Sequence, residues 1–171
     1  MAPIKPYSDA GARIEGAYRY ALWREWDPEL PRALWILLNP SWANVTKDDP
    51  TLRRCVSFSR AFGYGALSVV NLFAFRTPQP EQLQQAADPV GSENDQHIRA
   101  AVAQASTTIV AWGTNGSLYG RDKAVLAQLA QPLWCLGTNR DGSPRHPLYL
   151  KSECRLVPYL FQAQDCHLSH E

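Results

Sequence analysis

The chain has 171 residues, of which 45% are hydrophobic and 11% aromatic, and its formal net charge is +1. This length and composition exclude an intrinsically disordered chain and indicate one globular domain with its own core. The small net charge argues against a protein that grips duplex DNA through many phosphates, so any nucleic-acid contact must come from a local basic patch.

We expect a single domain over residues 1–171, with little regular structure at either end. Residues 1–16 contain prolines and glycines and predict an irregular N-terminal arm, and residues 162–171 are expected to form a flexible tail. No apolar run approaches the ~20 residues that cross a bilayer, and the first 16 residues lack the apolar core of a signal peptide. The expected location is therefore the cytoplasm, with no membrane partner.

The first half of the chain predicts three strands and one helix. A strand is predicted over 17–26 because bulky side chains recur there at every second residue. Two continuous apolar runs, at 33–38 and 66–73, are typical of strands buried on both faces. Between these runs, an acidic cap before Pro50 and a stop at Gly63 predict a helix.

The second half is predicted to continue the alternation of strands and helices. Further buried strands are expected at 107–112 and 132–137. Helices are expected at 80–87, after Ser92, at 121–130 and at 152–161.

Buried strands that alternate with amphipathic helices predict an α/β fold. We expect a three-layer α/β/α sandwich around a central, mostly parallel four-stranded sheet. Ligands of such sheets bind beyond the carboxyl ends of the strands. The segments that leave the predicted strands there contain Asn39, Asn71, Gly113 and His146. We predict that these residues build an active or binding site.

Each of these residues also has a structural explanation. Asn39 precedes a proline and can simply start a turn. Asn71 interrupts an apolar strand, so its amide must be hydrogen-bonded either by the scaffold or by a ligand. His146 stands in a loop and is either solvated or part of the site. The segment at Gly113 lacks the spacing of a phosphate-binding loop, but its backbone amides can approach a ligand closely.

Three arginines are candidates for contacts with an anion. Arg76 follows a strand end directly, and Arg53 and Arg54 adjoin the predicted helix start. Asp48 and Asp49 could form a catalytic pair, but helix capping is the simpler explanation. The four cysteines form no CxxC pair and no zinc-ligand spacing, so we expect neither a metal site nor a cofactor.

Six motifs follow one another along the chain: LLNPSWA (37–43), DDPTLRRC (48–55), NLFAFRTPQP (71–80), DPVGSEND (88–95), AWG (111–113) and HPLYL (146–150). Together they resemble a bacterial family of unknown function, the domain-of-unknown-function family sixteen forty-three. The resemblance covers roughly residues 18–150 and by itself implies no activity.

Some of the same segments are similar, in the same order, to motifs of the uracil-DNA glycosylase superfamily. ILLNPS is similar to the water-positioning motif, and ALSVVNLF to the strand that ends in the base-reading asparagine. IVAWG is similar to a strand that ends in Trp-Gly, and HPLYL to the His-Pro-Ser-Pro-Leu loop. This resemblance implies a uracil-DNA glycosylase-like fold, which agrees with the fold predicted above, and cleavage of an N-glycosidic bond in DNA.

The resemblance also implies a role for each candidate residue. Asn39 would hold the attacking water, Asn71 would read the base edge, and His146 would donate a hydrogen bond to the departing base. Leu148, Tyr149 or Leu150 would fill the gap left by a flipped nucleotide, and Trp42 or Phe73 would stack on the base. The remaining candidates are Pro40, Ser41, Arg76 and Gly113 for substrate contacts, and Arg53, Arg54 and Arg145 for phosphates.

The chain departs from the superfamily at several points, and three of them concern the residues of the site. Asn39 stands where the stronger water activator, an aspartate, is found, Ser41 replaces a glycine, and the loop after His146 lacks Ser-Pro. Three functions therefore stay open. They are a glycosylase for an unusual or damaged base in DNA, a non-catalytic module that binds a modified base or nucleic acid, and a hydrolase of free nucleosides or nucleotides.

Overall fold

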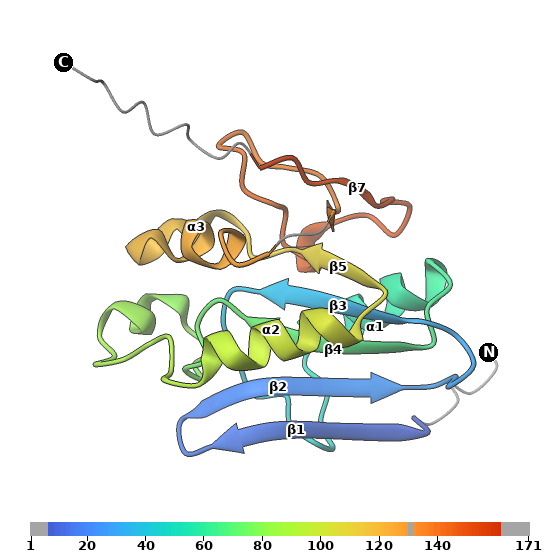
Figure 1. Cartoon of the computed structure of the whole chain (residues 1–171), viewed down its shortest axis with the longest axis horizontal. Coiled ribbons are helices and arrows are strands. Elements are labelled where there is room, and N and C mark those ends of the chain that lie inside the picture. The colour runs from blue at the N-terminus through green and yellow to red at the C-terminus, as the bar shows by residue number, and fades with distance from the viewer. Residues whose placement is uncertain (1–6, 130–131, 162–171) are drawn as a thin grey trace.

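The computed structural model describes residues 7–129 and 132–161, which form one mixed seven-stranded sheet with order β1-β2-β4-β3-β5-β6-β7 (Figure 1). The strands are β1 (Asp9–Glu15), β2 (Tyr18–Glu25), β3 (Arg32–Leu37), β4 (Ala66–Asn71), β5 (Thr107–Val110), β6 (Leu133–Cys135) and β7 (Val157–Pro158). The α-helices are α1 (Pro50–Ala61), α2 (Asn94–Gln104) and α3 (Arg121–Leu126), and the 3-10 helices are η1 (Pro80–Gln84), η2 (Thr114–Gly120) and η3 (Pro147–Tyr149).

The strands in the middle of the sheet, β4, β3, β5 and β6, are parallel and correspond to the four continuous apolar runs of the sequence. Residues 34–36 of β3 are fully buried, as expected for a strand covered on both faces. The predicted uracil-DNA glycosylase-like, four-stranded, mostly parallel sheet is nevertheless wrong. Antiparallel strands extend the sheet at both edges, β2 and β1 beyond β4 and β7 beyond β6. The fold is α/β overall, with a mixed sheet.

Part of the expected irregular arm over 1–16 is a strand. β1 pairs antiparallel with β2, and Gly16, at a φ of 57°, closes the turn between them. Gly11 lies in β1 against the ring of Trp23, where a Cβ atom would come within 2.1 Å of the ring. This glycine therefore permits close packing and does not mark a turn. Residues 1–6 and the predicted tail over 162–171 lie outside the described residues.

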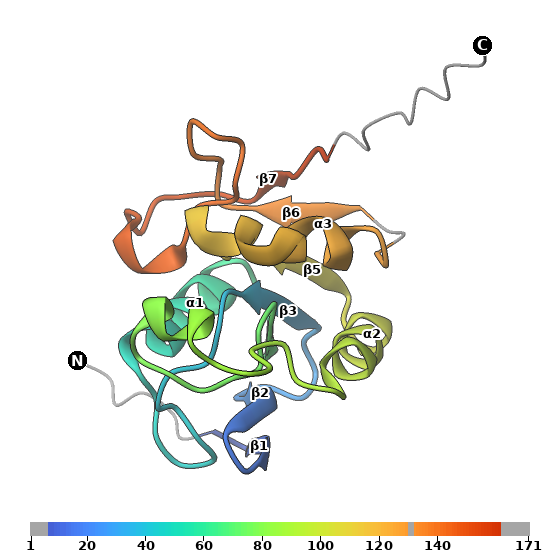
Figure 2. The same ribbon diagram turned by 90° about the vertical axis from the view of Figure 1, so that its left-hand side faces the viewer.

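Helices cover both faces of the sheet, with α1 on one face and α2 on the other (Figure 2). The start of α1 agrees with the prediction, because Oδ1 of Asp49 accepts a hydrogen bond from the amide of Leu52 at 2.8 Å. On this face Trp35 and Phe58 belong to one core cluster, whereas Ile98 of α2 belongs to a second cluster on the other face.

Other predicted helices are shorter than expected or absent. The helix predicted over 80–87 is the 3-10 helix η1, and the one predicted over 121–130 is α3. The helix predicted over 152–161 is wrong, since this segment contains β7, in which Val157 lies opposite Cys135 of β6. Pro158 explains the difference because proline lacks an N–H group and is tolerated at a sheet edge. Within residues 7–129 and 132–161, no helix is long and apolar enough to cross a membrane.

Candidate functional site

A cavity of about 560 Å³ lies at the carboxyl ends of β3, β4 and β5, on the face of the sheet that α1 covers. Its walls come from these strand ends, from the first turn of α1 and from the segment after β6. Such a volume suits a small-molecule site. Eight of the predicted site residues line it: Asn39, Ser41, Asn71, Gly113, Arg145, His146, Tyr149 and Leu150.

Asn71 ends β4 and lines the cavity with a side chain that is only 1% exposed. Neither its Oδ1 nor its Nδ2 has a hydrogen-bond partner in the described part of the chain. Its backbone is held by Asn94 of α2, whose Nδ2 donates to the carbonyl oxygens of Asn71 at 2.9 Å and Leu72 at 3.0 Å. The backbone of Asn71 is therefore held by α2, while the donor and the acceptor of its side-chain amide are both free for a ligand.

Asn39 follows β3, and two carbonyl groups orient its amide. Its Nδ2 donates to the carbonyl oxygen of Thr77 at 2.8 Å and to that of Pro40 at 3.1 Å. Both hydrogens of Nδ2 are thus engaged. The group that Asn39 offers to a ligand or a water molecule in the cavity is its Oδ1 acceptor.

Gly113 joins the end of β5 to the loop that carries His146. It has a φ of 77°, a conformation that favours glycine. Its N–H donates to the carbonyl oxygen of Pro144 at 2.9 Å, and a Cβ atom at this position would lie 3.6 Å from the Cβ of His146. The absence of a side chain therefore lets the His146 loop pass close to the strand end.

His146 caps η3, since its Nδ1 accepts a hydrogen bond from the amide of Leu148 at 3.2 Å. This bond places the proton of the neutral imidazole on Nε2. Burial lowers the pKa of His146 below its ordinary value of 6.5, against a smaller opposite effect of the Asp49 charge. At pH 7 His146 is therefore a neutral donor through Nε2. Tyr149 lies beside it, with ring centroids 6.2 Å apart, and is 85% exposed at the cavity.

Two further charged residues line the cavity, Arg19 and Asp49. Neither was predicted as a ligand contact. They are 4% and 7% exposed. Asp49 is the predicted cap of α1, and its position after a strand-end loop is a signal that could have placed it in the site. Arg19 comes from β2, whose pairing beside β4 has no signature in the sequence.

Residues 19–148 match a family model that is described as a protein of unknown function, DUF1643. The chain belongs to this family. No curated protein and no solved structure matches the chain. Apart from Tyr149 and Leu150, the cavity-lining residues fall within the DUF1643 segment. These comparisons do not show the resemblance to uracil-DNA glycosylases that the sequence motifs suggested.

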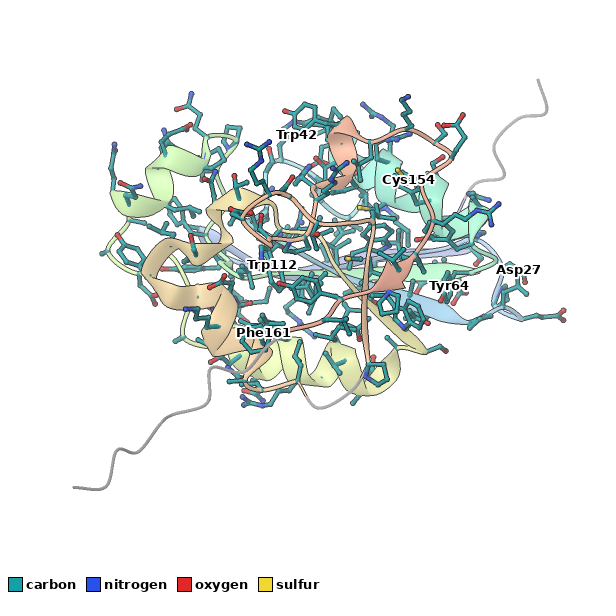
Figure 3. All side chains as sticks on the ribbon, turned by 90° about the horizontal axis from the view of Figure 1, so that it is seen from above. Asp27, Trp42, Tyr64, Trp112, Cys154 and Phe161 are labelled. Atoms are coloured by element: carbon teal, nitrogen blue, oxygen red, sulfur yellow. The ribbon has the colours of Figure 1, made fainter. Side chains whose placement is uncertain are left out.

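Five other predicted substrate contacts do not line the cavity of this DUF1643 domain: Pro40, Trp42, Phe73, Arg76 and Leu148. Phe73 is fully buried in the core cluster on the opposite face of the sheet, so it is not available to stack on a base here. Trp42 is 47% exposed at the edge of the molecule, whereas the buried Trp112 lies near its middle (Figure 3). The Nε of Arg76 donates to the carbonyl oxygen of Ser41 at 3.4 Å.

Of the predicted phosphate contacts, Arg145 lines the cavity and the other two do not. Arg53 is exposed and donates to a backbone carbonyl at the start of α1 at 2.8 Å. Arg54 donates to the carbonyl oxygens of Pro147 and Leu150, and its guanidinium lies 4.6 Å from the centre of a phenyl ring of α1. Arg54 therefore holds the DUF1643 loop that follows His146.

No group of three or more His, Cys, Asp or Glu side chains that could hold a metal ion occurs in residues 7–129 and 132–161. Cys55 and Cys135 are buried free thiols, and Cys166 lies outside the described residues. Burial raises the pKa of the Cys55 and Cys135 thiols. Raised thiol pKa values make both cysteines poor nucleophiles at neutral pH, which fits a structural role.

Proposed function

We propose that this protein hydrolyses the N-glycosidic bond of an unusual or damaged base in DNA, in the manner of the uracil-DNA glycosylases that its motifs resemble. The observation that carries the proposal is the buried amide of Asn71, whose donor and acceptor lack partners in the described structure. An amide with one free acceptor and free donors is complementary to the edge of a nucleobase. Asn39 and His146 line the same cavity.

In the proposed reaction, the oxygen of a water molecule bonds to the anomeric carbon of the sugar while the bond from that carbon to the base breaks. The electron pair of the broken bond leaves with the base, so negative charge grows there. The Nε2–H group of His146 is the donor that stabilises this charge. Because burial keeps His146 neutral at pH 7, the donor is present before the reaction begins.

Two side chains supply acceptors for the attacking water. Asn39 offers Oδ1, since its Nδ2 is engaged by two carbonyls. Asp49 brings a carboxylate to the same cavity, and only its Oδ1 is used to cap α1. The second carboxylate oxygen can accept the proton that the water loses. Asp49 can therefore act as the general base, a role for which the motif at Asn39 offers no carboxylate.

Two exposed aromatic side chains support a nucleic-acid substrate. Tyr149 is 85% exposed at the cavity, where it is suited to occupy the gap left by a flipped nucleotide. Trp42 is 47% exposed next to Ser41, which lines the cavity, and an exposed indole can stack on a neighbouring base.

The test uses end-labelled oligonucleotides, single- and double-stranded, that each carry uracil, hypoxanthine, xanthine or a hypermodified pyrimidine. After incubation, alkali converts abasic sites into strand breaks. We expect cleavage at one of these bases and its loss in Asn39→Ala. Equal cleavage by Asn39→Ala and the wild type would rule out the proposed mechanism, in which Asn39 holds the attacking water.

A second variant, Asp49→Asn, separates charge from helix capping. Asparagine caps a helix about as well as aspartate, so this variant keeps the start of α1. Loss of cleavage at an unchanged melting temperature supports the base role. Full activity of Asp49→Asn would show that Asp49 is not the base, so that Asn39 would be the residue that positions the attacking water.

The second candidate is a hydrolase of free nucleosides or nucleotides. The net charge of +1 favours it, as does the engagement of Arg53 and Arg54 with backbone carbonyls. Tighter binding of mononucleotides than of oligonucleotides would select it. Binding of a base without any cleavage would select a non-catalytic module.

We also propose that the protein works in the cytoplasm. Cys55, Cys135 and Cys154 are free thiols, which suits a reducing compartment.

A further inference from the structure

Arg19 is a buried cation that lines the cavity and forms no ion pair with another described residue. Its side chain is 4% exposed, and its Nη1 donates to the carbonyl oxygen of Ala43 at 3.0 Å. Nε has no hydrogen-bond partner in the part of the chain that the structure describes, and the ion pairs found there do not include Arg19. An unpaired buried guanidinium is unusual because burial of a charge is costly unless the charge is compensated.

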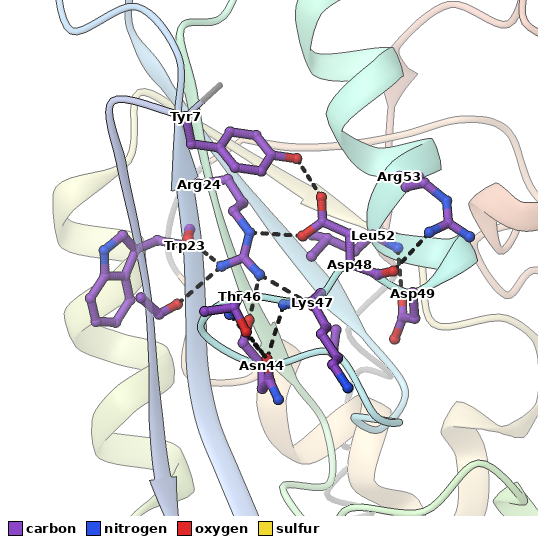
Figure 4. A network of polar contacts seen from close by, with 12 residues as sticks. Tyr7, Trp23, Arg24, Asn44, Thr46, Lys47, Asp48, Asp49, Leu52 and Arg53 are labelled. Atoms are coloured by element: carbon purple, nitrogen blue, oxygen red, sulfur yellow. Dashed lines mark hydrogen bonds and ion pairs between the residues drawn. The ribbon is translucent and has the colours of Figure 1, made fainter. Parts of the chain in front are cut away.

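Arg24, on the same strand, shows how the protein compensates a buried arginine elsewhere (Figure 4). Its side chain is 1% exposed, and its Nε pairs with Oδ1 of Asp48 at 2.9 Å. Its other nitrogens donate to backbone carbonyls, including those of Trp23 and Lys47. Strand β2 therefore contributes one arginine that the protein neutralises and one that it leaves available.

A β-bulge turns Arg19 toward the cavity. In the pairing of β1 with β2, Arg13 lies opposite Ala21 and the next residue, Ile14, lies opposite Arg19, so Tyr20 is the extra residue. Simple alternation from Leu22, which faces α1, would place Arg19 on the opposite face of the sheet. The extra residue reverses this orientation. Bulges that re-aim a side chain in this way occur preferentially beside functional sites.

The surroundings of Arg19 suit an anion. Burial lowers the pKa of Arg19 to about 10, so the group stays charged at pH 7. Among the neighbouring charges, Asp49 has the largest effect and raises this pKa, whereas Arg76 and Arg24 lower it by smaller amounts. Asp49 therefore offsets part of the positive charge, but one of its oxygens is used as the cap of α1.

We infer that Arg19 forms a subsite for a small oxyanion group that enters the cavity together with the base. This inference rests on the proposed function, in which Asn71 reads that base. A side chain that is only 4% exposed offers little surface to the backbone phosphates of a strand outside the cavity. The oxyanion must belong to the unit that enters, either as the 5′-phosphate of a mononucleotide or as an acidic substituent on the base. Both bind a guanidinium through charge-assisted hydrogen bonds.

Calorimetry on the full-length protein at pH 7.5 tests this subsite with matched pairs of probes. Each common deoxynucleoside is compared with its 5′-monophosphate, and uracil is compared with 5-carboxyuracil. We expect the acidic member of one pair to bind about tenfold or more tightly than its neutral partner. An advantage in the nucleotide pairs assigns the anion to the phosphate, and one in the uracil pair assigns it to the base.

The advantage of the acidic probe should disappear in Arg19→Gln, while affinity for the neutral probe stays unchanged. Because Arg19→Gln removes an unpaired buried charge, it should fold, and Arg19→Met provides a second variant. Arg76→Gln is the matched control, since it removes a nearby charge that does not line the cavity, and it should keep the advantage.

Equal affinity within every pair for the wild type, or the same advantage in Arg19→Gln, overturns the inference. Absence of binding by all probes overturns it too. Cleavage of oligonucleotides without an anion advantage would leave the proposed function standing and remove the subsite alone. An Arg19-dependent advantage without any cleavage would retain the subsite and remove the glycosidase.

Discussion

Asn71 and Asn94 are two buried asparagines at the same strand end whose amides are used differently. Asn94 donates from Nδ2 to two backbone carbonyls, whereas both polar atoms of the Asn71 side chain lack partners among the described residues. The sequence could predict that an amide inside an apolar strand needs a partner. It could not predict whether scaffold or ligand supplies it, because that depends on what α2 and the neighbouring strands bring within reach.

The contrast predicts different effects on stability. Asn94→Ala should lower the free energy of unfolding by about 1–3 kcal/mol, since it removes a buried donor shared by the carbonyls of Asn71 and Leu72, although Leu72 keeps Nε of Arg121 as a second donor. Asn71→Ala should lower it by about 0.5 kcal/mol or less, because no protein hydrogen bond is lost. Urea denaturation of both variants measures the difference. A cost for Asn71→Ala equal to that for Asn94→Ala would show that the Asn71 amide serves the scaffold.

His146 gives the protein a defined response to acid. Its pKa in the folded state lies below the ordinary value of 6.5, so the unfolded chain binds more protons once the pH falls below that value. Any stability due to neutral His146 is complete above about pH 6.5 and is lost as the pH falls toward the lower folded-state pKa. Protonation also removes the acceptor that Nδ1 offers to the amide of Leu148.

The variant His146→Asn should therefore lose less stability than the wild type between pH 7.5 and pH 5.5. Its Oδ1 can still accept the Leu148 amide, so capping of η3 is kept while titration is removed. Chemical denaturation at both pH values gives the comparison. Parallel losses in the two proteins would show that His146 does not titrate in this range.

At the scale of elements, the four central strands and β2 were predictable, whereas the edge strands β1 and β7 were not. Continuous apolar runs mark β3, β4, β5 and β6 because both faces of these strands are buried. Within β2, the bulge at Tyr20 interrupts the alternation of side chains and changes the face of the sheet on which Arg19 lies. Residues 157–158 form an edge strand of only two residues, too short to leave a periodic pattern.

Arg54 connects α1 to the loop of η3, and its loss should loosen that loop. Because Arg54 donates to the carbonyls of Pro147 and Leu150, we expect Arg54→Gln to increase amide hydrogen exchange in residues 146–150 about tenfold or more. Arg53→Gln is the control, since its side chain is exposed and, within the described structure, bonds only at the start of α1. Equal exchange in both variants would contradict a positioning role for Arg54.

For the whole molecule, the sequence predicted which residues come together where parallel topology determines their position. Asn39, Asn71, Gly113 and His146 come from distant parts of the sequence, yet all line one cavity at the carboxyl ends of parallel strands. The same argument does not hold for Phe73, which was predicted to contact the base. This residue lies past the end of β4 and packs into the core cluster on the opposite face of the sheet. Knowing which strand ends converge does not determine the face on which each following side chain lies.

The charge of the whole molecule predicts a weak salt dependence of nucleic-acid binding. The net charge is +1, Arg53 and Arg54 are engaged with backbone carbonyls, and the buried Arg19 is out of reach of an external strand. With one or two phosphate contacts, affinity for a single-stranded oligonucleotide should fall about three- to sevenfold between 50 and 200 mM salt. Fluorescence anisotropy of a labelled strand measures this slope. A fall of about three hundredfold or more, as expected for six or more phosphate contacts to a single strand, would require a basic track that the cavity and its neighbouring arginines do not provide.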